Sequence, residues 1–274
     1  MQRSLVGSEM CIRDRDTHTH ILWNIDDGSK NQCMSLQMLE IAARSGTKAI
    51  FATPHVIERA NKPSWEEIKE KTQQLRQLCA EAQIDIMLYP GAEVQMNWEL
   101  LPELGATGAY CLNGGRYLLI ELPAAEIPAY ADEFWYELEL KGITPILAHP
   151  ERYQQLRENP DLLLLWRRRG MLMQCNSGSF TGMFGSSVCE NAKVLLANGL
   201  VDLLGSDGHR SEGRNTDMSR AAAVIRQLAG EEVLRQLTET NPQAILKNQE
   251  IELKQPKVLL EDKPKSFWQK LFGK

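Results

Sequence analysis

The sequence predicts an α/β protein with a mainly parallel sheet, folded as a closed or distorted (β/α) barrel. Three observations favour this class. About seven short apolar segments alternate with amphipathic segments of helical period, which is typical of β-α units that build a parallel sheet. The composition is that of an ordinary globular chain, with 43% hydrophobic and 24% charged residues. At 274 residues, a barrel is favoured over an open sheet, and its chemistry would lie on loops at the strand carboxyl ends.

The first fifteen residues do not fit this pattern. The stretch "SLVGSEMCIRDR" (residues 4–15) has neither strand nor helix periodicity, and no apolar run follows a basic start as in a signal peptide. One translation of the transposase-end adapter used in sequencing libraries gives the same residues in register. We therefore expect residues 1–15 to be a non-native, adapter-derived segment fused to a gene that lacks its first codons. The alternative is a natural disordered tail.

The remaining chain begins with two strands around a helix. "THIL" (19–22) is expected to be the end of a strand, and the amphipathic segment 34–46 is expected to be a helix that Gly46 closes. The apolar segment "AIFATP" (49–54) then predicts a buried strand that Pro54 ends.

The middle of the chain continues the alternation. A long amphipathic helix is expected over 63–82, begun by Pro63 and Ser64 and carrying two glutamates in its first turn, where the helix dipole favours them. Two strands are expected next, over 84–94 and 117–123, the second preceded by a turn at "NGG". The segment 129–142 is then expected to be helical.

The last part repeats the pattern, with proline near the start of one helix and glycine just past its end. The expected elements are a strand at 144–150, a helix at 159–170, a strand at 172–179, a helix at 188–199, a strand at 201–207, and helix up to about residue 246. We place the folded domain at 16–250 and a polar tail at 251–274. The basic, aromatic end "PKSFWQKLFGK" is expected to be solvated, and partner docking or membrane contact is the alternative.

Composition excludes several classes of function. The net charge of −5 does not suggest nucleic-acid binding. No apolar run approaches the roughly 18 residues that a membrane span needs, so no stable membrane insertion is expected. Apart from Cys11 of the adapter-like segment, five cysteines are widely spaced and form no C-x-x-C motif, which indicates reduced thiols in the cytosol.

The five histidines all occupy one kind of position, at or just beyond the end of a predicted strand. They are His18, His20, His55, His149 and His209. A single histidine of this kind would more often be a core or surface residue. Five of five, with carboxylates at matching places, is hard to obtain by chance. Those carboxylates are Asp27 after the first strand, Glu93 in "GAE", Glu121 in "IEL" and Asp207 in "SDGH".

The spacing of these residues suits metal binding. His18 and His20 are two apart on a strand, so their side chains point the same way, and the same holds for Asp207 and His209. Glu121 alone could form a buried ion pair, but beside the others it is better read as a ligand. Nine imidazole and carboxylate donors are enough for two or three ions. We expect Mn²⁺, with Fe²⁺ or Zn²⁺ as alternatives. Such sites activate water and clamp an in-line displacement at phosphorus.

The motifs "HTHIL…DDG", "ATPH", "GAE", "LLIEL", "AHPERY" and "GSDGH" resemble, in that order, the PHP (polymerase and histidinol phosphatase) superfamily. "AHPERY" with "LIEL" and "DDGS" resembles most its bacterial protein-tyrosine phosphatases, the CpsB/CapC family of capsule and exopolysaccharide loci. The resemblance covers about 16–246. It implies a distorted (β/α)7 barrel of the PHP type and a trinuclear metal site.

The resemblance also implies a grouping of ligands and two phosphate-binding arginines. His18, His20, Glu93 and Asp207 would share one ion, Glu93, Glu121 and His149 a second, and Asp27, His55 and His209 a third. Asp27 is preferred to Asp26, because the family uses the second aspartate of "DDG". Arg152 and Arg214 would bind the phosphoryl oxygens, with Arg210 as a competitor for the second role. After "ATPH" this chain departs from relatives with "VIERANKP", which puts the rim of the substrate site in doubt.

Three functions follow from these observations. The first is metal-dependent hydrolysis of phosphotyrosine in protein, with a bacterial tyrosine kinase of polysaccharide export as partner. The second is another PHP phosphoesterase, such as histidinol-phosphate phosphatase. The third is a degenerate module that binds partners without catalysis, which the complete ligand set argues against. A cysteine phosphatase is excluded because no cysteine is followed by arginine in a C-x₅-R motif; the segment from Cys111 to Arg116 is one residue too short.

Overall fold

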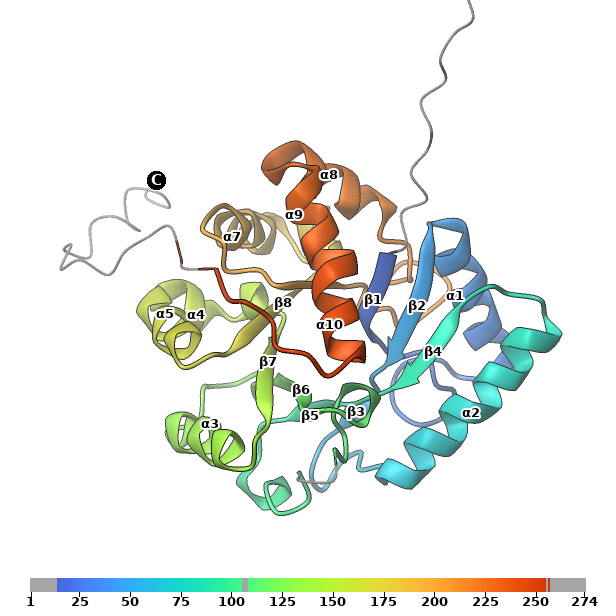
Figure 1. Ribbon diagram of the computed structural model, residues 1–274, viewed down its shortest axis with the longest axis horizontal. Coiled ribbons are helices and arrows are strands. Elements are labelled where there is room, and N and C mark those ends of the chain that lie inside the picture. The colour runs from blue at the N-terminus through green and yellow to red at the C-terminus, as the bar shows by residue number, and fades with distance from the viewer. Residues whose placement is uncertain (1–13, 105–107, 255, 257–274) are drawn as a thin grey trace, which may run out of the picture.

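The computed structural model describes residues 14–104, 108–254 and 256. Its strands form a curled parallel sheet with helices on the outside (Figure 1). The strands are β1 (Asp14–Thr19), β2 (Thr47–Ala52), β3 (His55–Val56), β4 (Met87–Pro90), β5 (Glu93–Gln95), β6 (Tyr117–Glu121), β7 (Thr144–Ala148), β8 (Leu172–Asn176) and β9 (Leu203–Gly205).

These strands occupy seven positions around a distorted barrel. One sheet has the order β1-β2-β4 and the other the order β3-β5-β6-β7-β8-β9. β3 follows β2 after two residues, and β5 follows β4 after two residues, so each pair fills a single position interrupted by a break. All ladders between these strands are parallel. A parallel bridge between Thr19 and Gly208 connects β1 to the segment after β9. The (β/α)7 barrel expected from the sequence is confirmed.

The helices connect successive strands and cover the outside of the barrel. They are α1 (Gln32–Arg44), α2 (Trp65–Glu81), α3 (Ala131–Leu140), α4 (Gln154–Glu158), α5 (Pro160–Arg168), α6 (Ser177–Phe180), α7 (Ser186–Ala197), α8 (Ser219–Ala229), α9 (Glu231–Arg235) and α10 (Asn241–Leu246). Caps fix two of the starts: Asn31 accepts a hydrogen bond from the Met34 N–H, and Ser64 accepts one from Glu67. No helix in the described ranges is both long enough and apolar enough to cross a membrane.

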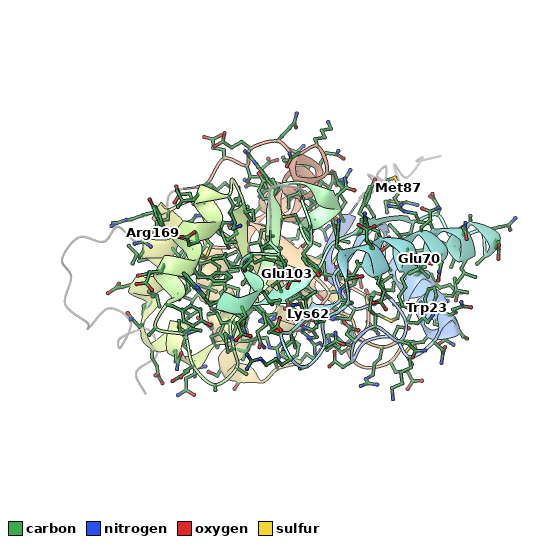
Figure 2. The ribbon with its side chains drawn as sticks, turned by 90° about the horizontal axis from the view of Figure 1, so that it is seen from below. Trp23, Lys62, Glu70, Met87, Glu103 and Arg169 are labelled. Carbon is green, nitrogen blue, oxygen red and sulfur yellow. The ribbon has the colours of Figure 1, made fainter. Side chains whose placement is uncertain are left out.

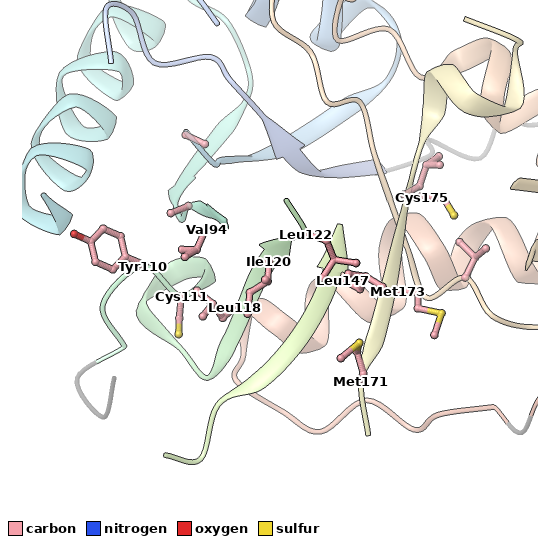
Figure 3. Packing of buried hydrophobic residues seen from close by; sticks show 14 of the residues in the cluster. Val94, Tyr110, Cys111, Leu118, Ile120, Leu122, Leu147, Met171, Met173 and Cys175 are labelled. Carbon is pink, nitrogen blue, oxygen red and sulfur yellow. The ribbon is translucent and has the colours of Figure 1, made fainter. Parts of the chain in front are cut away.

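Alternation along the strands separates two apolar clusters. Leu118, Ile120, Leu147 and Met173 belong to the larger cluster that packs beneath the helices, and Figure 3 shows them on neighbouring strands. The alternate residues of the same strands, together with residues of β2 and β9, form a second cluster, which we call the inner cluster. It includes Phe51, Tyr117, Leu119, Ile146, Ala148, Leu172 and Leu203, with Ile245 of α10. Side chains two residues apart on a strand point to the same face. Glu121 therefore lies on the same face of its strand as Leu119, and Gln174 on the same face as Leu172.

The inner cluster is closed at the ends where the strands begin. Ile245 of α10 and Ile251 pack there, and the Tyr117 hydroxyl donates to the Gln249 carbonyl at 2.6 Å. Figure 1 shows α10 lying beside β1. The other end of the barrel, where the strands stop, is therefore the end open to chemistry.

Several expected boundaries are wrong. β1 begins at Asp14, two residues before the expected start of the folded domain. Residues 1–13 lie outside the described residues, so the extent and origin of the adapter-like segment stay predictions. β1 also ends at Thr19 and does not extend over 19–22. The chain turns back there because the Ser29 N–H donates to the His20 carbonyl at 3.0 Å. Gly28 is required in this turn, since a Cβ would lie 2.2 Å from that same oxygen.

Other differences concern the later elements. The strand expected over 84–94 is split, because the chain leaves the ladder at Gly91 and Ala92. The strand expected over 172–179 stops at Asn176, where α6 begins at once. The segment 208–218 is not helical, and α4 was not expected. Most of the tail at 251–274 lies outside the described residues.

Candidate metal centre

The nine predicted ligands meet at the carboxyl end of the barrel. Their donor atoms form three groups, and within each group all the donor atoms lie within 4.8 Å of one another. The groups are His18, His20 and Asp207; His55, Glu93 and Glu121; and His20, Asp27, His55 and His209. His149 also joins, because its Nε2 lies 2.8 Å from Glu93 Oε1. The structure thus brings together residues that are up to 191 positions apart in the chain.

The first group forms around two histidines of the β1 end. His18 Nε2 lies 3.1 Å from Glu93 Oε2 and 3.5 Å from Asp207 Oδ1. His20 Nε2 lies 3.3 Å from each of the same two oxygens. All four side chains are buried. Four donor atoms facing one another over these distances match the first grouping that the resemblance implies.

Glu93 links this group to a second one. Its Oε2 also lies 3.1 Å from His55 Nδ1, and that nitrogen lies 3.5 Å from Glu121 Oε1. His149 approaches the other oxygen of Glu93. The neighbours of Glu121 in this group are therefore His55 and Glu93, whereas the resemblance pairs Glu121 with Glu93 and His149.

Asp27 and His209 lie on the outer side of the cluster. Asp27 Oδ1 is 3.3 Å from His209 Nε2 and 3.7 Å from His55 Nε2. His55 thus faces two groups, one with each ring nitrogen. Asp27 is the most exposed member, with 69% of its side chain accessible, so its carboxylate faces the open side of the centre.

Two residues that were not among the predicted ligands orient the histidines. Asp26 Oδ2 accepts a hydrogen bond from His20 Nδ1 at 2.7 Å and another from the His55 N–H at 3.0 Å. Gln174 Oε1 lies 2.8 Å from His18 Nδ1. In both histidines Nε2 is therefore the ring nitrogen that points into the cluster, the arrangement usual for imidazole ligands. Asp26 therefore holds the His20 ring, while Asp27 reaches the donor cluster itself.

The backbone after two strands also places ligands in a way that periodicity did not indicate. His149 and Asp207 both have positive φ, at 37° and 52°. Asp207 lies beyond the end of β9, so the expectation that Asp207 and His209 extend the last strand is wrong. Each of these residues turns its side chain toward the cluster from a loop at the strand end. Left-handed conformations outside glycine are uncommon and concentrate at functional sites.

The electrostatics of the centre favour positive charge. Burial raises the pKa of Glu121 to about 8, and the nearby charge of Glu93 adds to this shift. Burial would also raise the pKa of Glu93, but the imidazoles of His18 and His55 hold it well below its usual range. Burial lowers the pKa of His55 to about 4, with His20 contributing. These carboxylates thus depend on neighbouring cations to stay ionised.

The donor set fits metal ions. Glu93 Oε2, Asp207 Oδ1, His55 Nδ1 and His209 Nε2 are buried atoms without a hydrogen-bond partner among the described residues. Buried polar atoms are normally satisfied, and these four belong to the donor groups described above. His55 Nδ1 faces Glu93 Oε2, Asp207 Oδ1 faces His18 and His20, and His209 Nε2 faces Asp27. Cations bound within these groups would satisfy the atoms, and imidazole with carboxylate suits Mn²⁺, Fe²⁺ or Zn²⁺.

Both predicted arginines lie beside this centre. Arg152 Nη1 is 3.3 Å from Asp207 Oδ2, and Arg214 Nη2 donates to the same oxygen. Both line a cavity of about 770 Å³ together with six of the nine predicted ligands and residues 122–125. Arg210 is exposed and does not line this cavity, so Arg214 is the better placed of the two. Asp207 thus contacts the ligand cluster with one oxygen and the arginines with the other.

The divergent "VIERANKP" segment follows His55 directly, but none of its residues lines this cavity. Its charges are paired: Arg59 Nη2 lies 2.5 Å from Glu99 Oε1, and Lys62 Nζ lies 2.5 Å from Glu103 Oε1 and 2.8 Å from Glu58 Oε2. Figure 2 shows Lys62 next to Glu103. Neighbouring carboxylates therefore hold the cations of this segment.

The described cysteines are separate from the centre. Cys33, Cys79, Cys111, Cys175 and Cys189 are all unpaired, and the residues that line the cavity include no cysteine. Burial raises the pKa of Cys111 to about 12 and that of Cys175 well above its usual value. These two thiols are poor nucleophiles.

Comparison with known proteins agrees with this geometry. Residues 15–247 match the family described as "Capsular polysaccharide synthesis, CpsB/CapC". The chain is 35% identical over 236 residues to tyrosine-protein phosphatase YwqE of Bacillus subtilis, covering 86% of this chain and 92% of that protein.

Two solved structures extend the comparison. One comes from work on YwqE of Bacillus subtilis and CpsB of Streptococcus pneumoniae, described as unique metal-dependent tyrosine phosphatases. It superposes with a TM-score of 0.84 at 32% identity, covering 90% of this chain and 100% of the other. Histidinol phosphate phosphatase of Lactococcus lactis, solved with zinc, histidinol and phosphate, shares the fold at a TM-score of 0.52 and 16% identity, covering 79% and 94%. The chain belongs to the CpsB/CapC family.

Proposed function

We propose that this member of the CpsB/CapC family is a metal-dependent phosphatase that hydrolyses phosphotyrosine in protein. The observation that carries the proposal is the joint placement of nine N and O donors and two arginines at one barrel end. The similarity to YwqE over nearly its full length supports the same activity. The unpaired donor atoms of the centre give an independent reason to expect metal.

The roles of the protein side chains follow from their contacts. Glu93 would bridge two ions, since its Oε2 faces both the His18–His20 pair and His55. When bound, the ions would neutralise phosphoryl charge and activate water for in-line attack. Asp26 and Gln174 hold two imidazoles with the correct nitrogen inward.

The arginines would complete the recognition of a phosphate dianion. Their guanidinium groups stand at the edge of the ligand cluster, and each has further N–H donors beyond the one used by Asp207. Arg214 Nε, for instance, is buried without a hydrogen-bond partner among the described residues. Guanidinium forks match phosphoryl oxygens. The apolar segment 122–125 beside them offers a surface for the ring of the substrate.

We also propose the identity of the metal, the protein substrate and the cellular compartment. Mn²⁺ is our first choice for two or three ions, because imidazole and carboxylate ligands without thiolate suit it. The phosphoprotein is proposed to be a bacterial tyrosine kinase of capsule or exopolysaccharide synthesis, in line with the family description. The unpaired cysteines fit a reducing compartment, and we propose the cytoplasm.

The decisive experiment compares two substrates on metal-reconstituted protein. We expect turnover of a phosphotyrosine peptide, with a kcat/KM well above that for histidinol phosphate. The reverse preference would support the small-molecule phosphoesterase, which shares the fold. Turnover of neither substrate after loading with Mn²⁺, Fe²⁺ or Zn²⁺ would contradict both.

A further inference from the structure

One aromatic ring lies against both arginines of the centre. The Arg152 guanidinium carbon is 4.7 Å from the centre of the Phe184 ring, and that of Arg214 is 5.6 Å from it. Both distances fall within the range of cation–π contacts. The two guanidinium groups also share Asp207 Oδ2. We propose that Phe184 is a positioning residue that holds this pair of arginines ready for a phosphoryl group, an inference that rests on the proposed function.

The ring is needed because the pair is otherwise weakly held. Two like charges converge on one carboxylate oxygen, and the side chains are about one-third exposed, at 33% for Arg152 and 28% for Arg214. Asp207 is buried, but the outer part of each arginine lies in solvent, where a long side chain keeps rotamer freedom. The negative face of one ring attracts both cations at once and limits the directions in which they can swing.

The local fold keeps Phe184 in place. It lies on the short turn between α6 and α7, and α6 follows directly from the end of β8. The Met183 N–H donates to the Gly178 carbonyl at 3.0 Å, which closes this turn. A Cβ on Gly178 would come within 3.1 Å of the Phe184 ring, so the backbone of α6 packs closely against the ring. The ring is thus fixed to the same strand end as the centre.

A second contact ties the arginine turn to the same unit. Glu151, the residue before Arg152, is buried and accepts hydrogen bonds from the Asn176 N–H at 2.9 Å and the Ser179 hydroxyl at 2.6 Å. The backbone at Arg152 is therefore fixed relative to α6. What remains to be fixed is the direction of the long side chains, and that is the part which Phe184 contacts.

The test uses Phe184→Leu, Phe184→Tyr and the matched control Met183→Ala, whose side chain is exposed on the same turn. Affinity for inorganic phosphate is measured by calorimetry on metal-loaded protein, and kcat/KM on a phosphotyrosine peptide. We expect Phe184→Leu to weaken phosphate binding and to lower kcat/KM, each about tenfold, with unchanged metal content and Tm. Phe184→Tyr keeps an aromatic face and should stay within about twofold of the parent, as should Met183→Ala.

A mutant cycle separates positioning from a general packing role. In the Arg152→Ala/Arg214→Ala background, Phe184→Leu should have no further effect on phosphate affinity, because its targets are gone. An equal loss in that background, or full affinity in Phe184→Leu alone, would overturn the inference. If the parent protein binds phosphate but does not hydrolyse phosphotyrosine, the proposed function fails and the phosphate data still judge Phe184. If the metal-loaded parent binds no phosphate, the inference fails as well.

Discussion

Two buried aspartates flank β9, one near each end of the barrel, and each binds arginine. At the beginning of the strand, Asp202 Oδ2 accepts hydrogen bonds from Arg167 Nη1 and from the Met173 N–H at 2.8 Å. Arg167 is 3% exposed, and its other donors reach the carbonyls of Met171, Gly199 and Lys254. In this pair the charges neutralise each other, and the guanidinium donates to protein oxygens on several sides.

At the other end of β9, Asp207 also binds arginine, but not all of its hydrogen-bonding capacity is used. Its Oδ2 accepts from Arg152, from Arg214 and from Asn176 Nδ2 at 2.5 Å. Its Oδ1 has no hydrogen-bond partner among the described residues and faces His18 and His20. The Asp202 pair, with its donors satisfied, has a structural role, and removing one partner would leave a buried charge uncompensated. The unsatisfied atoms around Asp207 leave room for metal and substrate.

The largest expected effect comes from removing metal. Chelation should abolish turnover at the Asp207 end, and added Mn²⁺ or a similar ion should restore it, because the donors of the centre are arranged for cations. Alkylation of the cysteines should leave most of the activity. The measurement is phosphotyrosine hydrolysis before and after each treatment. Inactivation by iodoacetamide together with indifference to a chelator would refute the mechanism.

Loss of single ligands should separate a bridging residue from a terminal one. Glu93→Ala should empty two metal positions and end catalysis, since its Oε2 faces two donor groups. His209→Ala should remove one ion and leave a centre of lower activity. Metal analysis of both purified proteins checks this. A full complement of metal in Glu93→Ala would show that Glu93 is not a bridge.

The arginines should matter less than the metals but still strongly. Arg152→Ala should keep its fold and metals and lose about 10²–10³ in kcat, or roughly 2.7–4 kcal/mol of transition-state stabilisation, the typical cost of one such donor. Arg152→Lys should recover little, because an ammonium group cannot reproduce the guanidinium fork. Steady-state kinetics and metal analysis of both variants test this prediction. Normal turnover by Arg152→Ala would leave phosphate binding to metal and Arg214 alone.

The smallest effect on turnover is expected at the Asp202 end. Arg167→Leu leaves a buried carboxylate without its cation and should cost about 3–5 kcal/mol in the free energy of unfolding. The activity per folded molecule should not change. Arg169→Leu is the matched control: its side chain is 44% exposed, and it should cost less than about 1 kcal/mol. Urea unfolding and steady-state kinetics on the parent, Arg167→Leu and Arg169→Leu test this difference between the two ends of the barrel. A large loss of kcat in Arg167→Leu would contradict a purely structural role for the Asp202 pair.

Much of the candidate centre could be predicted because the residues expected as ligands follow strands. The i, i+2 spacing of His18 and His20 and the placement of His55, Glu93 and Glu121 at strand ends depend on local pattern alone, and parallel strands bring such ends to one edge. The grouping of ligands was less accessible. His55 faces two donor groups through its two nitrogens, which no spacing along the chain reveals.

The alternation of the main strands and helices, the barrel class and the metal-binding candidates could be predicted from the sequence, because hydrophobic period and residue type are local properties. Three features appear only in the folded chain: Gln174 orients His18 across 156 positions, Asp26 holds His20 while Asp27 faces the centre, and Phe184 contacts both arginines. The tertiary structure also decided the left-handed turns at His149 and Asp207. These features depend on contacts between distant segments, and such contacts exist only once the strands have closed into the barrel.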